Sequence, residues 1–471
     1  MDCSVLQRAL RKADPLRPAF PIPISPGRGP AEEWMVDESM DYTMKEVLQF
    51  VAENDVKFIR LAFCDIFGIQ KNISIMPDEL PRAFSEGISF DASAVRGFLN
   101  VEESDLFLRP DPRTLSVLPW RPSHGRVVRL YCDILTPDGQ PFGGDGRAAL
   151  RAAVKRAEDA GFSCQAGSEC EFYLFELDDE GNPTDIPHDR AGYCDIAPKD
   201  KGENVRREIC LTLEQMSIRP VSSHHEQGPG QNEIDFRYGP MLEAADNLVT
   251  FQSVVKTIAA RSGLHATFMP KPLPQESGNG LHINLSLYRN GQNLFRIGNE
   301  HSPESESFIA GILRRVREIT AFLNPVTNSY ERFGSFEAPK YVSWSHQNRS
   351  QLIRIPPARD EHLRMELRSP DPVCNPYLAF ALLLDAGMEG IRDKLPLCPP
   401  CNGGGHERHS AGREALPARL DEAVALARSS EFVRTSLPGI LLEHYLDAKQ
   451  EEYEQCLAAV DPAEWEHDRY F

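Results

Sequence analysis

The chain has 471 residues, 41% of them apolar and 26% charged, which is the composition of a globular protein with a large hydrophobic core. Its 51 basic residues stand against 70 acidic residues, giving a net charge of −19. That excess disfavours binding to nucleic acid or to an anionic membrane surface. No apolar run of about 18 residues occurs, so no membrane-spanning helix is predicted.

The N-terminus lacks the continuous apolar stretch of a secretory signal. The eleven cysteines are scattered without the spacing of a disulfide framework, as expected for reduced thiols in a cytoplasmic protein. Residues 1–39 include the proline-rich stretch PLRPAFPIPISPGRGP, which predicts an extended or disordered extension. Such a segment is a passive tail, a docking segment, or an over-long start of the coding frame.

Globular patterning begins at Tyr42. The stretch TMKEVLQFVAEN predicts a short amphipathic helix, and KFIRLAFCDIFGIQKNISI predicts two strands that meet around Phe67-Gly68. GRVVRLYCDIL predicts another strand, after which TPDGQPFGGDGR has the polar, glycine-rich composition of a connection. Residues 40–137 are therefore predicted to form a small, mostly β domain.

Residues 138–471 are predicted to form a second, larger domain. Asp145 is expected to cap a helix, RAALRAAVKRAEDA, that ends at Gly161. Strands and helices alternate from there to about residue 395. A loop follows in PLCPPCNGGGHERHSAG, and the chain from Asp421 onward is predicted to be helical.

Five predicted strands of the second domain have one apolar face and one polar face. In GSECEFYLF, residues 167–175, Glu169 and Glu171 share a face because successive side chains of a strand point to opposite sides. A single strand of this kind is ordinary solvent-exposed surface. The pattern recurs, however, in NEIDFRY, LHINLSL, LIRIP and RMELRSPDP, which place on their polar faces Glu233, Asp235, Arg237, His282, Asn284, Ser286, Arg354, Arg364, Glu366 and Arg368. We expect a curved sheet, backed by helices, whose concave face forms a polar cavity.

So many carboxylates in one cavity need positive charge, and Glu226 of SHHEQGPGQNE adds to their number. Oxygen ligands with one imidazole favour Mg²⁺ or Mn²⁺ over a structural zinc. The arginines indicate an anion in the same place, and metals with arginines stabilise a transferring phosphoryl group. A two-metal hydrolase would use similar carboxylates, but the arginines fit nucleotide and phosphate handling better. No P-loop or Rossmann glycine motif is present.

Six longer motifs carry a family resemblance. GSECEF, SHHEQGPGQNE, TFMPKPLPQESGNGLH, NPVTNSYERFGSFEAP, NRSQLIRIP and MELRSPDPVCNPYLA together resemble the bacterial type I glutamine synthetases, from about residue 55 to about residue 395. The resemblance implies an α+β fold, with a small N-terminal β-grasp domain and a C-terminal catalytic domain whose curved antiparallel sheet is backed by helices. It also implies a cytoplasmic homo-oligomer of two stacked hexamers, a dodecamer, with active sites between subunits.

The same resemblance implies at least two Mg²⁺ or Mn²⁺ ions per active site. The implied ligands of one ion are Glu171, Glu226 and Glu233. Those of the other are Glu169, His282 and Glu366. The neighbours of Glu226, His224 and His225, are expected to support the ligands rather than to bind metal directly.

The resemblance also assigns the substrates. Residues implied to bind glutamate are Arg332, Arg368, Ser277 and Gly278. Those implied on the ATP side are Arg354, Arg364, Asn284 and Ser286. Implied catalytic residues are Arg349 at the transferring phosphate, Glu337 in a flap, Tyr193 in an ammonium pocket, and Asp91, which accepts a proton from ammonium in the adjacent subunit's site.

The implied reaction is phosphorylation of the γ-carboxylate of glutamate by ATP, followed by displacement of phosphate by ammonia to give glutamine. Two stretches depart from the family pattern: Asp-Gly-Ser-Ser is here Asp91-Ala92-Ser93-Ala94, and Asn-Gly-Ser-Gly is here Ser277-Gly278-Asn279-Gly280. Both lie where the amine or glutamate would bind. A γ-glutamyl ligase for polyamines or monoamines is therefore an alternative, as is a catalytically silent structural or regulatory homologue.

The loop at 396–412 has no equivalent of the tyrosine that some family members have adenylylated, so that control is expected to be absent. The loop instead contains Cys398, Cys401, His406 and His409, in an order that resembles a zinc pattern. The spacing between the pairs is short, and an ordinary loop is the favoured interpretation.

Overall fold

The structure is a computed structural model and describes residues 42–101, 104–295, 302–358, 362–401 and 413–471. The proline-rich segment 1–39 lies outside these residues, as do His406 and His409. Of the four residues in the pattern that resembles a zinc site, the structure therefore describes only the two cysteines. Cys398 is exposed, and the buried Cys401 accepts a hydrogen bond at Sγ from the Arg413 guanidinium.

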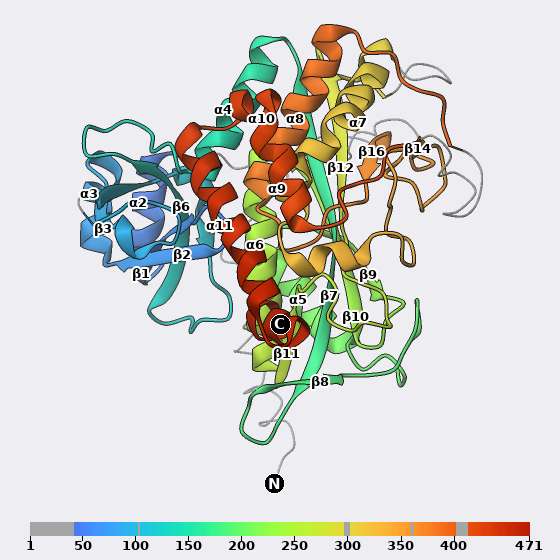
Figure 1. Cartoon of the computed structure of the whole chain (residues 1–471). Coiled ribbons are helices and arrows are strands. Elements are labelled where there is room, and N and C mark those ends of the chain that lie inside the picture. The colour runs from blue at the N-terminus through green and yellow to red at the C-terminus, as the bar shows by residue number, and fades with distance from the viewer. Residues whose placement is uncertain (1–41, 102–103, 296–301, 359–361, 402–412) are drawn as a thin grey trace, which may run out of the picture. The chain divides into compact units, whose positions relative to one another are not determined.

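Among the described residues, the N-terminal part contains a six-stranded sheet of order β2-β1-β6-β4-β3, with β5 on β6. This part is drawn in blue and teal in Figure 1. β1 and β6 are parallel, and the other pairs are antiparallel. The strands are β1 (Val56–Cys64), β2 (Gln70–Ile75), β3 (Ile88–Asp91), β4 (Asp105–Pro110), β5 (Ser116–Val117) and β6 (Arg126–Leu135). Its helices are α2 (Met44–Glu53) and α3 (Leu80–Ser85), with single turns η1 (Pro77–Glu79), η2 (Ala92–Ala94) and η3 (Pro112–Thr114). The predicted helix and strands of this part are confirmed. The structure adds a capping box between Thr43 and Glu46 at the start of α2.

The larger part contains a curled sheet with ten strands among the described residues. Its order is β14-β15-β16-β12-β7-β10-β9, with β8 and β11 on β7 and β13 on β12. All pairs are antiparallel except β14–β15, so the sheet predicted as antiparallel is mixed at one edge. The strands are β7 (Ser163–Leu177), β8 (Pro183–Pro187), β9 (Pro220–His225), β10 (Gln231–Pro240), β11 (Leu264–Thr267), β12 (Leu281–Arg289), β13 (Gln292–Asn293), β14 (Trp344–Ser345), β15 (Ile353–Arg354) and β16 (Met365–Leu367).

Helices cover the apolar side of this sheet. They are α4 (Gly146–Asp159), α5 (Glu203–Gln215), α6 (Met241–Arg261), α7 (Pro303–Leu323), α8 (Pro376–Asp393), α9 (Leu420–Ser429), α10 (Glu431–Ser436), α11 (Gly439–Ala458) and α12 (Pro462–Tyr470), with the turn η4 (Thr327–Arg332). Asp145 caps α4 as predicted, since its Oδ1 accepts the Arg147 N–H at 2.9 Å. α7 and α8 touch at Gly311, where a Cβ would stand 2.1 Å from the Ala386 carbonyl oxygen. In the described part of the chain, no helix combines the length and the apolar character needed to cross a membrane.

The two sheets meet through a buried network of ion pairs on Arg147, the second residue of α4. Its guanidinium contacts Asp111 at 3.0 Å, Asp246 at 2.8 Å and Asp133 at 3.2 Å. Arg113 also contacts Asp111, at 2.8 Å. Burial opposes ionisation of Asp111, but Arg113 and Arg147 outweigh it and lower its pKa to about 2. Each carboxylate of this junction therefore has a cation supplied by the protein.

Candidate active site

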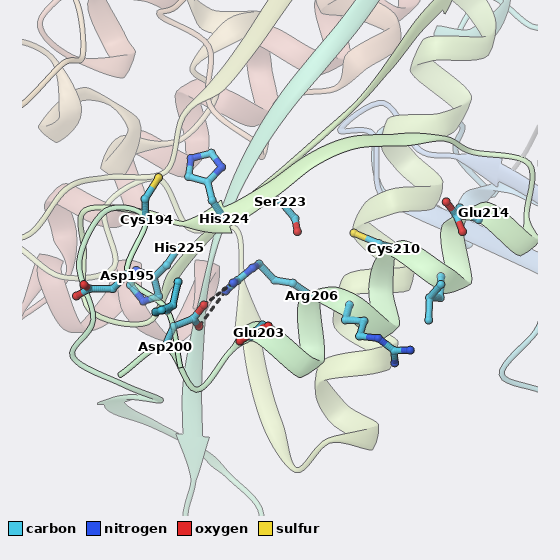
Figure 2. A pocket seen from close by; sticks show the side chains of 13 residues that line it. Cys194, Asp195, Asp200, Glu203, Arg206, Cys210, Glu214, Ser223, His224 and His225 are labelled. Atoms are coloured by element: carbon cyan, nitrogen blue, oxygen red, sulfur yellow. Dashed lines mark hydrogen bonds and ion pairs between the residues drawn. The ribbon is translucent and has the colours of Figure 1, made fainter. Parts of the chain in front are cut away.

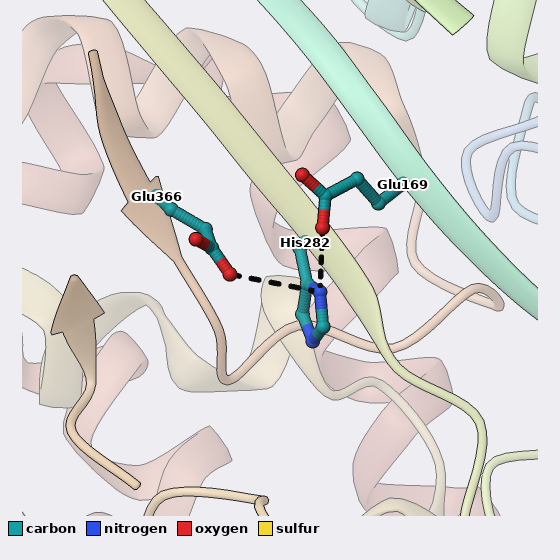
Figure 3. Close-up of side chains that lie close together, drawn as sticks. All are labelled: Glu169, His282 and Glu366. Carbon is teal, nitrogen blue, oxygen red and sulfur yellow. Dashed lines mark hydrogen bonds and ion pairs between the residues drawn. The ribbon is translucent and has the colours of Figure 1, made fainter. Parts of the chain in front are cut away.

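Three predicted metal ligands converge from neighbouring strands: Glu169 on β7, His282 on β12 and Glu366 on β16 (Figure 3). One donor atom from each lies within 4.8 Å of the other two. His282 Nδ1 is 3.1 Å from a Glu169 oxygen and 3.8 Å from a Glu366 oxygen. The sheet register explains the cluster, because His282 stands opposite Glu169, and Asn284 stands opposite Glu366. The grouping predicted for one ion is thus present.

A second group contains Glu226, Glu233 and His224, whose donor atoms also lie within 4.8 Å of one another. Glu233 on β10 stands between Glu171 on β7 and His224 on β9 in the sheet register. His224 Nε2 is 2.9 Å from a Glu226 oxygen, consistent with the supporting position expected for it. Glu171, predicted as the third ligand, stands outside this cluster.

Glu171 is held by two donors. Its Oε2 accepts the Gly280 N–H at 2.7 Å and the Gln231 side-chain amide at 3.1 Å. Its other oxygen faces the space beside Gly280, where an added Cβ would meet Arg332 Nη2 at 3.1 Å, His282 Nε2 at 3.3 Å and Glu171 Oε1 at 3.5 Å. Glycine at position 280 therefore leaves room between the two groups of ligands.

Two carboxyls of this face have raised pKa values, and burial is the largest cause of both shifts. Burial, joined by the charge of Glu226 and opposed by His282, raises the pKa of Glu171 to about 7. Burial and the charges of Glu171 and Asp235 raise the pKa of Glu233 well above its usual value. For Glu169 burial acts in the same direction, but hydrogen bonds from His282 and Asn284 prevail and lower its pKa to about 2. Buried carboxylates with an imidazole are a donor set that fits Mg²⁺ or Mn²⁺.

Arginines border the same face. Glu366 accepts from Arg354 Nη1 at 2.6 Å and also from Arg368, whose Nη2 lies 3.1 Å from Glu337. Arg332 is buried, and its Nη1 donates to the carbonyl oxygens of Ser369 at 3.0 Å and Pro370 at 3.3 Å. Among the described residues Arg332 forms no ion pair with a carboxylate. Burial lowers the pKa of the Arg332 guanidinium, and the nearby charges of Asp371 and Glu171 oppose this shift, so an anionic ligand would share the cation with these carboxylates.

Two predicted ATP-side residues make different contacts. Asn284 donates to Glu169 at 2.9 Å and accepts from Arg364 Nε at 2.8 Å, so it links a predicted metal ligand to an arginine. Ser286 donates to the Leu363 carbonyl oxygen at 3.3 Å. Both lie on the polar face of β12, as the alternation predicted.

The remaining predicted residues are more peripheral. Tyr193 is 58% exposed, and its ring packs edge-on against His224, with ring centroids 5.4 Å apart. Arg349 is exposed in the turn after β14. Asp91 is exposed at the end of β3, and its described hydrogen bonds, from the Ser93 N–H and hydroxyl, remain within its own turn. The fold thus does not gather Asp91 with the metal ligands of its own chain.

A cavity of about 500 Å³ adjoins His224 on the outer side of β9 (Figure 2). Arg206 of α5 and Asp200 form an ion pair of 2.5 Å in its wall. The exposed apolar side chains of Ile196 and Leu211 also line it. β9 is an edge strand, so this cavity and the exposed Val221 form an outer border of the site.

Gln231, which is 1% exposed and donates to Glu171, was not identified from the sequence. A signal was present, because Gln231 lies two residues before Glu233 on β10 and so shares its face. The side chain of Gln231 is a neutral amide, which is neither an acid nor a base nor a typical metal ligand. Asp235, which joins Glu169 and Glu233 in a third group of donor atoms within 4.8 Å, was seen on this face but given no role.

A β-grasp sheet joined to a curled sheet with carboxylates and arginines on one face defines a class of two-domain α+β proteins with a candidate metal-dependent site. The model of the glutamine synthetase β-grasp domain matches residues 55–137, and that of the glutamine synthetase catalytic domain matches residues 143–470. The chain belongs to the glutamine synthetase family. The predicted fold class and the family resemblance are therefore confirmed.

Similar proteins agree in length as well as in sequence. A protein named glutamine synthetase from Methanosarcina mazei is 47% identical over 445 residues, 93% of this chain and 99% of the relative. One from Clostridium saccharobutylicum is 44% identical over 440 residues, 91% and 98% of the two chains. A solved structure of a GmaS/ADP complex is 30% identical, with a TM-score of 0.81, over 90% of this chain and 98% of the other. The Plasmodium falciparum glutamine synthetase structure, at 22% identity and a TM-score of 0.80 over 91% and 99% of the chains, shares the fold.

Proposed function

We propose that the chain is a glutamate–ammonia ligase, which uses ATP to join glutamate and ammonia into glutamine. The observation that carries this proposal is the arrangement around Gly280. There, the buried carboxyls of Glu171 and Glu233, whose pKa values burial raises, share a face with the guanidinium of Arg332, which forms no ion pair in the described part of the chain. Relatives named glutamine synthetase, 47% and 44% identical over nearly their whole length, support the same activity.

Mg²⁺ or Mn²⁺ held by the two carboxylate groups would neutralise the phosphoryl oxygens of ATP during transfer. The ligands proposed for these ions are Glu169, His282 and Glu366, and Glu171, Glu226 and Glu233. Arg332 and Arg368 bind the carboxylates of glutamate and hold its γ-carboxylate toward ATP, with Ser277 and Gly278 in the adjoining loop. Orienting two anionic substrates beside fixed cations is the main way a protein accelerates phosphoryl transfer.

The nucleotide lies on the side of Arg354, Arg364, Asn284 and Ser286, and Arg349 contacts the transferring phosphate. The similar GmaS structure is a complex with ADP, which supports a nucleotide site in this fold. Glu337, paired with Arg368 but still 45% exposed at its side chain, closes over the γ-glutamyl phosphate and excludes water.

The ammonium pocket contains Tyr193 beside His224 and Glu226. Asp91 of a neighbouring subunit takes the proton from ammonium, which agrees with its exposure and with contacts confined to its own turn. The enzyme is therefore a homo-oligomer, proposed as two stacked hexamers with sites between subunits.

The ten described cysteines are free thiols, which supports a cytoplasmic location. We place the boundary between the β-grasp and catalytic domains at residues 137 and 138.

A γ-glutamyl-amine ligase is the second candidate. It is favoured by Ala92 and Ala94, which replace the glycine and a serine typical of the family in the turn that follows Asp91. The experiment is to supply ATP, Mg²⁺ and glutamate with ammonium, methylamine or putrescine, to follow phosphate release, and to identify products by mass. Glutamine from millimolar ammonium supports the proposal. A strong preference for an organic amine supports the second candidate, and no turnover with any acceptor would overturn both.

A further inference from the structure

The side chain of Gln231 lies at the centre of a closed hydrogen-bond network beside the candidate metal ligands. Its Nε2 donates to Glu171 Oε2 at 3.1 Å and to the Gly278 carbonyl oxygen at 3.2 Å. Its Oε1 accepts the Gly228 N–H at 3.0 Å and the hydroxyl of Ser277. Asn279 Oδ1 lies 3.4 Å from the same Nε2 as a further acceptor. Both hydrogens of the amide nitrogen and both acceptor positions of the amide oxygen are thus used.

The surroundings allow only one orientation of this amide. The Gly228 N–H can only donate, whereas the Gly278 carbonyl oxygen and an ionised Glu171 can only accept. Turning the amide over would place its oxygen against two acceptors and its nitrogen against a donor. Because Gln231 is 1% exposed, water would not compensate for those losses.

The backbone of Gln231 fixes the turn that carries another candidate ligand. The Glu226 N–H donates to the Gln231 carbonyl oxygen at 2.8 Å, and the Gln231 N–H donates to the Gly228 carbonyl oxygen at 3.0 Å. One residue therefore contacts the carboxylate of Glu171 with its side chain and the turn of Glu226 with its main chain. Both glutamates are assigned to the same ion.

The loop that departs from the family pattern contributes the rest of the network. Ser277 is 8% exposed; its hydroxyl faces Gln231, and its carbonyl oxygen accepts the hydroxyl of Tyr173 at 2.6 Å. Asn279 is fully buried, and its Nδ2 donates to the Met269 carbonyl oxygen at 2.9 Å. The polar atoms of these two side chains are directed into the protein rather than toward a ligand.

We propose that Gln231 is a positioning residue that fixes Glu171 and the Glu226 turn for metal binding, and that Ser277 acts through Gln231 by holding its amide in the required orientation. The substituted loop is then part of the support of the metal site and does not select the amine acceptor. This inference rests on the proposed function for its metal site, but its first test requires no catalysis.

The first experiment measures Mn²⁺ binding by the electron paramagnetic resonance signal of free Mn²⁺, in the full chain without substrates. In Gln231→Glu an oxygen replaces the donor that faces Glu171, and we expect the dissociation constant of one of the two Mn²⁺ sites to rise by about 10- to 100-fold. Gln215→Glu adds the same charge at the exposed end of α5 and should leave the constant unchanged. Wild-type affinity in Gln231→Glu would overturn the proposal.

The role of Ser277 is tested by Ser277→Ala, Ser277→Thr and the double variant with Gln231→Glu. We expect Ser277→Ala to weaken Mn²⁺ binding several-fold. Ser277→Thr keeps the hydroxyl and should weaken binding less. The double variant should bind Mn²⁺ no more weakly than Gln231→Glu alone. Additive effects would show that Ser277 does not act through Gln231. If Gln231→Glu fails to fold, as judged by circular dichroism, the alanine and threonine variants decide the question through the same constant.

The acceptor provides an independent readout. The ratio of kcat/KM for ammonium to that for methylamine should be the same in Ser277→Ala as in the wild type, and a shift toward methylamine would overturn the proposal. A wild-type chain that binds Mn²⁺ but makes no glutamine would instead overturn the proposed function, while the binding results still decide the role of Gln231.

Discussion

Two regions of the molecule bury acidic residues in opposite ways. At the junction of the two sheets, Asp111, Asp133 and Asp246 surround Arg147 and are matched by the protein's own cations. On the polar face of the curled sheet, Glu171 and Glu233 lie close together without such a match, and burial raises their pKa values. The comparison of these two regions indicates that burial alone does not make a carboxylate structural or functional. The sign of the nearest fixed charges decides whether a buried carboxylate is held ionised by the protein itself or needs a bound cation.

The junction should respond most strongly to loss of its cation. Arg147→Met would leave Asp111 and Asp246 buried without a counter-charge, and we expect the free energy of unfolding to fall by about 3–5 kcal/mol, measured by urea denaturation. Arg151→Met is the matched control, because Arg151 is 37% exposed and should contribute less than about 1 kcal/mol. A small effect of Arg147→Met would mean that the junction, too, tolerates unpaired carboxylates.

The candidate active site, unlike the junction, should lose no stability when one of its charged groups, a carboxylate, is removed. Glu233→Gln relieves repulsion, so the melting temperature in EDTA at pH 8 should be no lower than that of the wild type. The increase in melting temperature on adding Mg²⁺ should be lost, and kcat/KM should fall by more than about 100-fold. Glu180→Gln, at an exposed turn, should change neither quantity. A lower melting temperature of Glu233→Gln in EDTA would contradict the proposed difference between the two regions.

Acid should act on the junction through Asp111. The pKa of this carboxyl is lowered to about 2 from 3.8, so its stabilising contribution is present above pH 3.8 and is lost as the pH falls through about 2. Asp111→Asn should therefore cost about 2 kcal/mol at pH 7, and its difference from the wild type should shrink at lower pH. Asp179→Asn, at an exposed turn, serves as control in denaturation measured at pH 7 and pH 3. A difference independent of pH would exclude the ion pairs as its cause.

The smallest expected effect concerns the space between the two ligand groups. In Gly280→Ala the added methyl would lie 3.1 Å from Arg332 Nη2 and 3.3 Å from His282 Nε2, so these side chains would have to move by a few tenths of an ångström. We expect kcat/KM for glutamate to fall by about tenfold, with unfolding in EDTA nearly unchanged. Unchanged kinetics would mean that this space is not used by substrate or ion.

The sequence predicted the parts of the fold and site that depend on local periodicity. The alternation in GSECEFYLF and LHINLSL placed Glu169 and His282 on polar strand faces, and the structure brings them together across β7 and β12. The cap at Asp145 was equally readable, because capping is a contact between near neighbours. The grouping of Glu366 with these two residues came only from the family resemblance, and the strand register that brings Glu366 to the same point was not predicted.

Other features could not be read because they depend on partners far apart in the chain. Arg147 looked like an ordinary charge on a helix, since its partners Asp111 and Asp246 are separated from it by 36 and 99 positions. The alternation in LIRIP predicted the strand that is β15, but no alternation marked the two residues of β14, and the parallel pairing of these strands was not predicted. Gln231 was missed because its importance lies in its hydrogen bonds with five neighbours rather than in chemistry of its own.

The presence of Glu169 and Glu171 on the single strand β7 links the two ligand groups in a further way. Two residues of a β-strand advance by about 7 Å, so the separation of the groups follows from covalent geometry and not from a loop that could relax. One residue inserted into β7 ahead of Glu169 would turn both glutamates into the hydrophobic core and bring Cys170 to the polar face. Such an insertion would therefore disrupt both candidate ion sites in a single step.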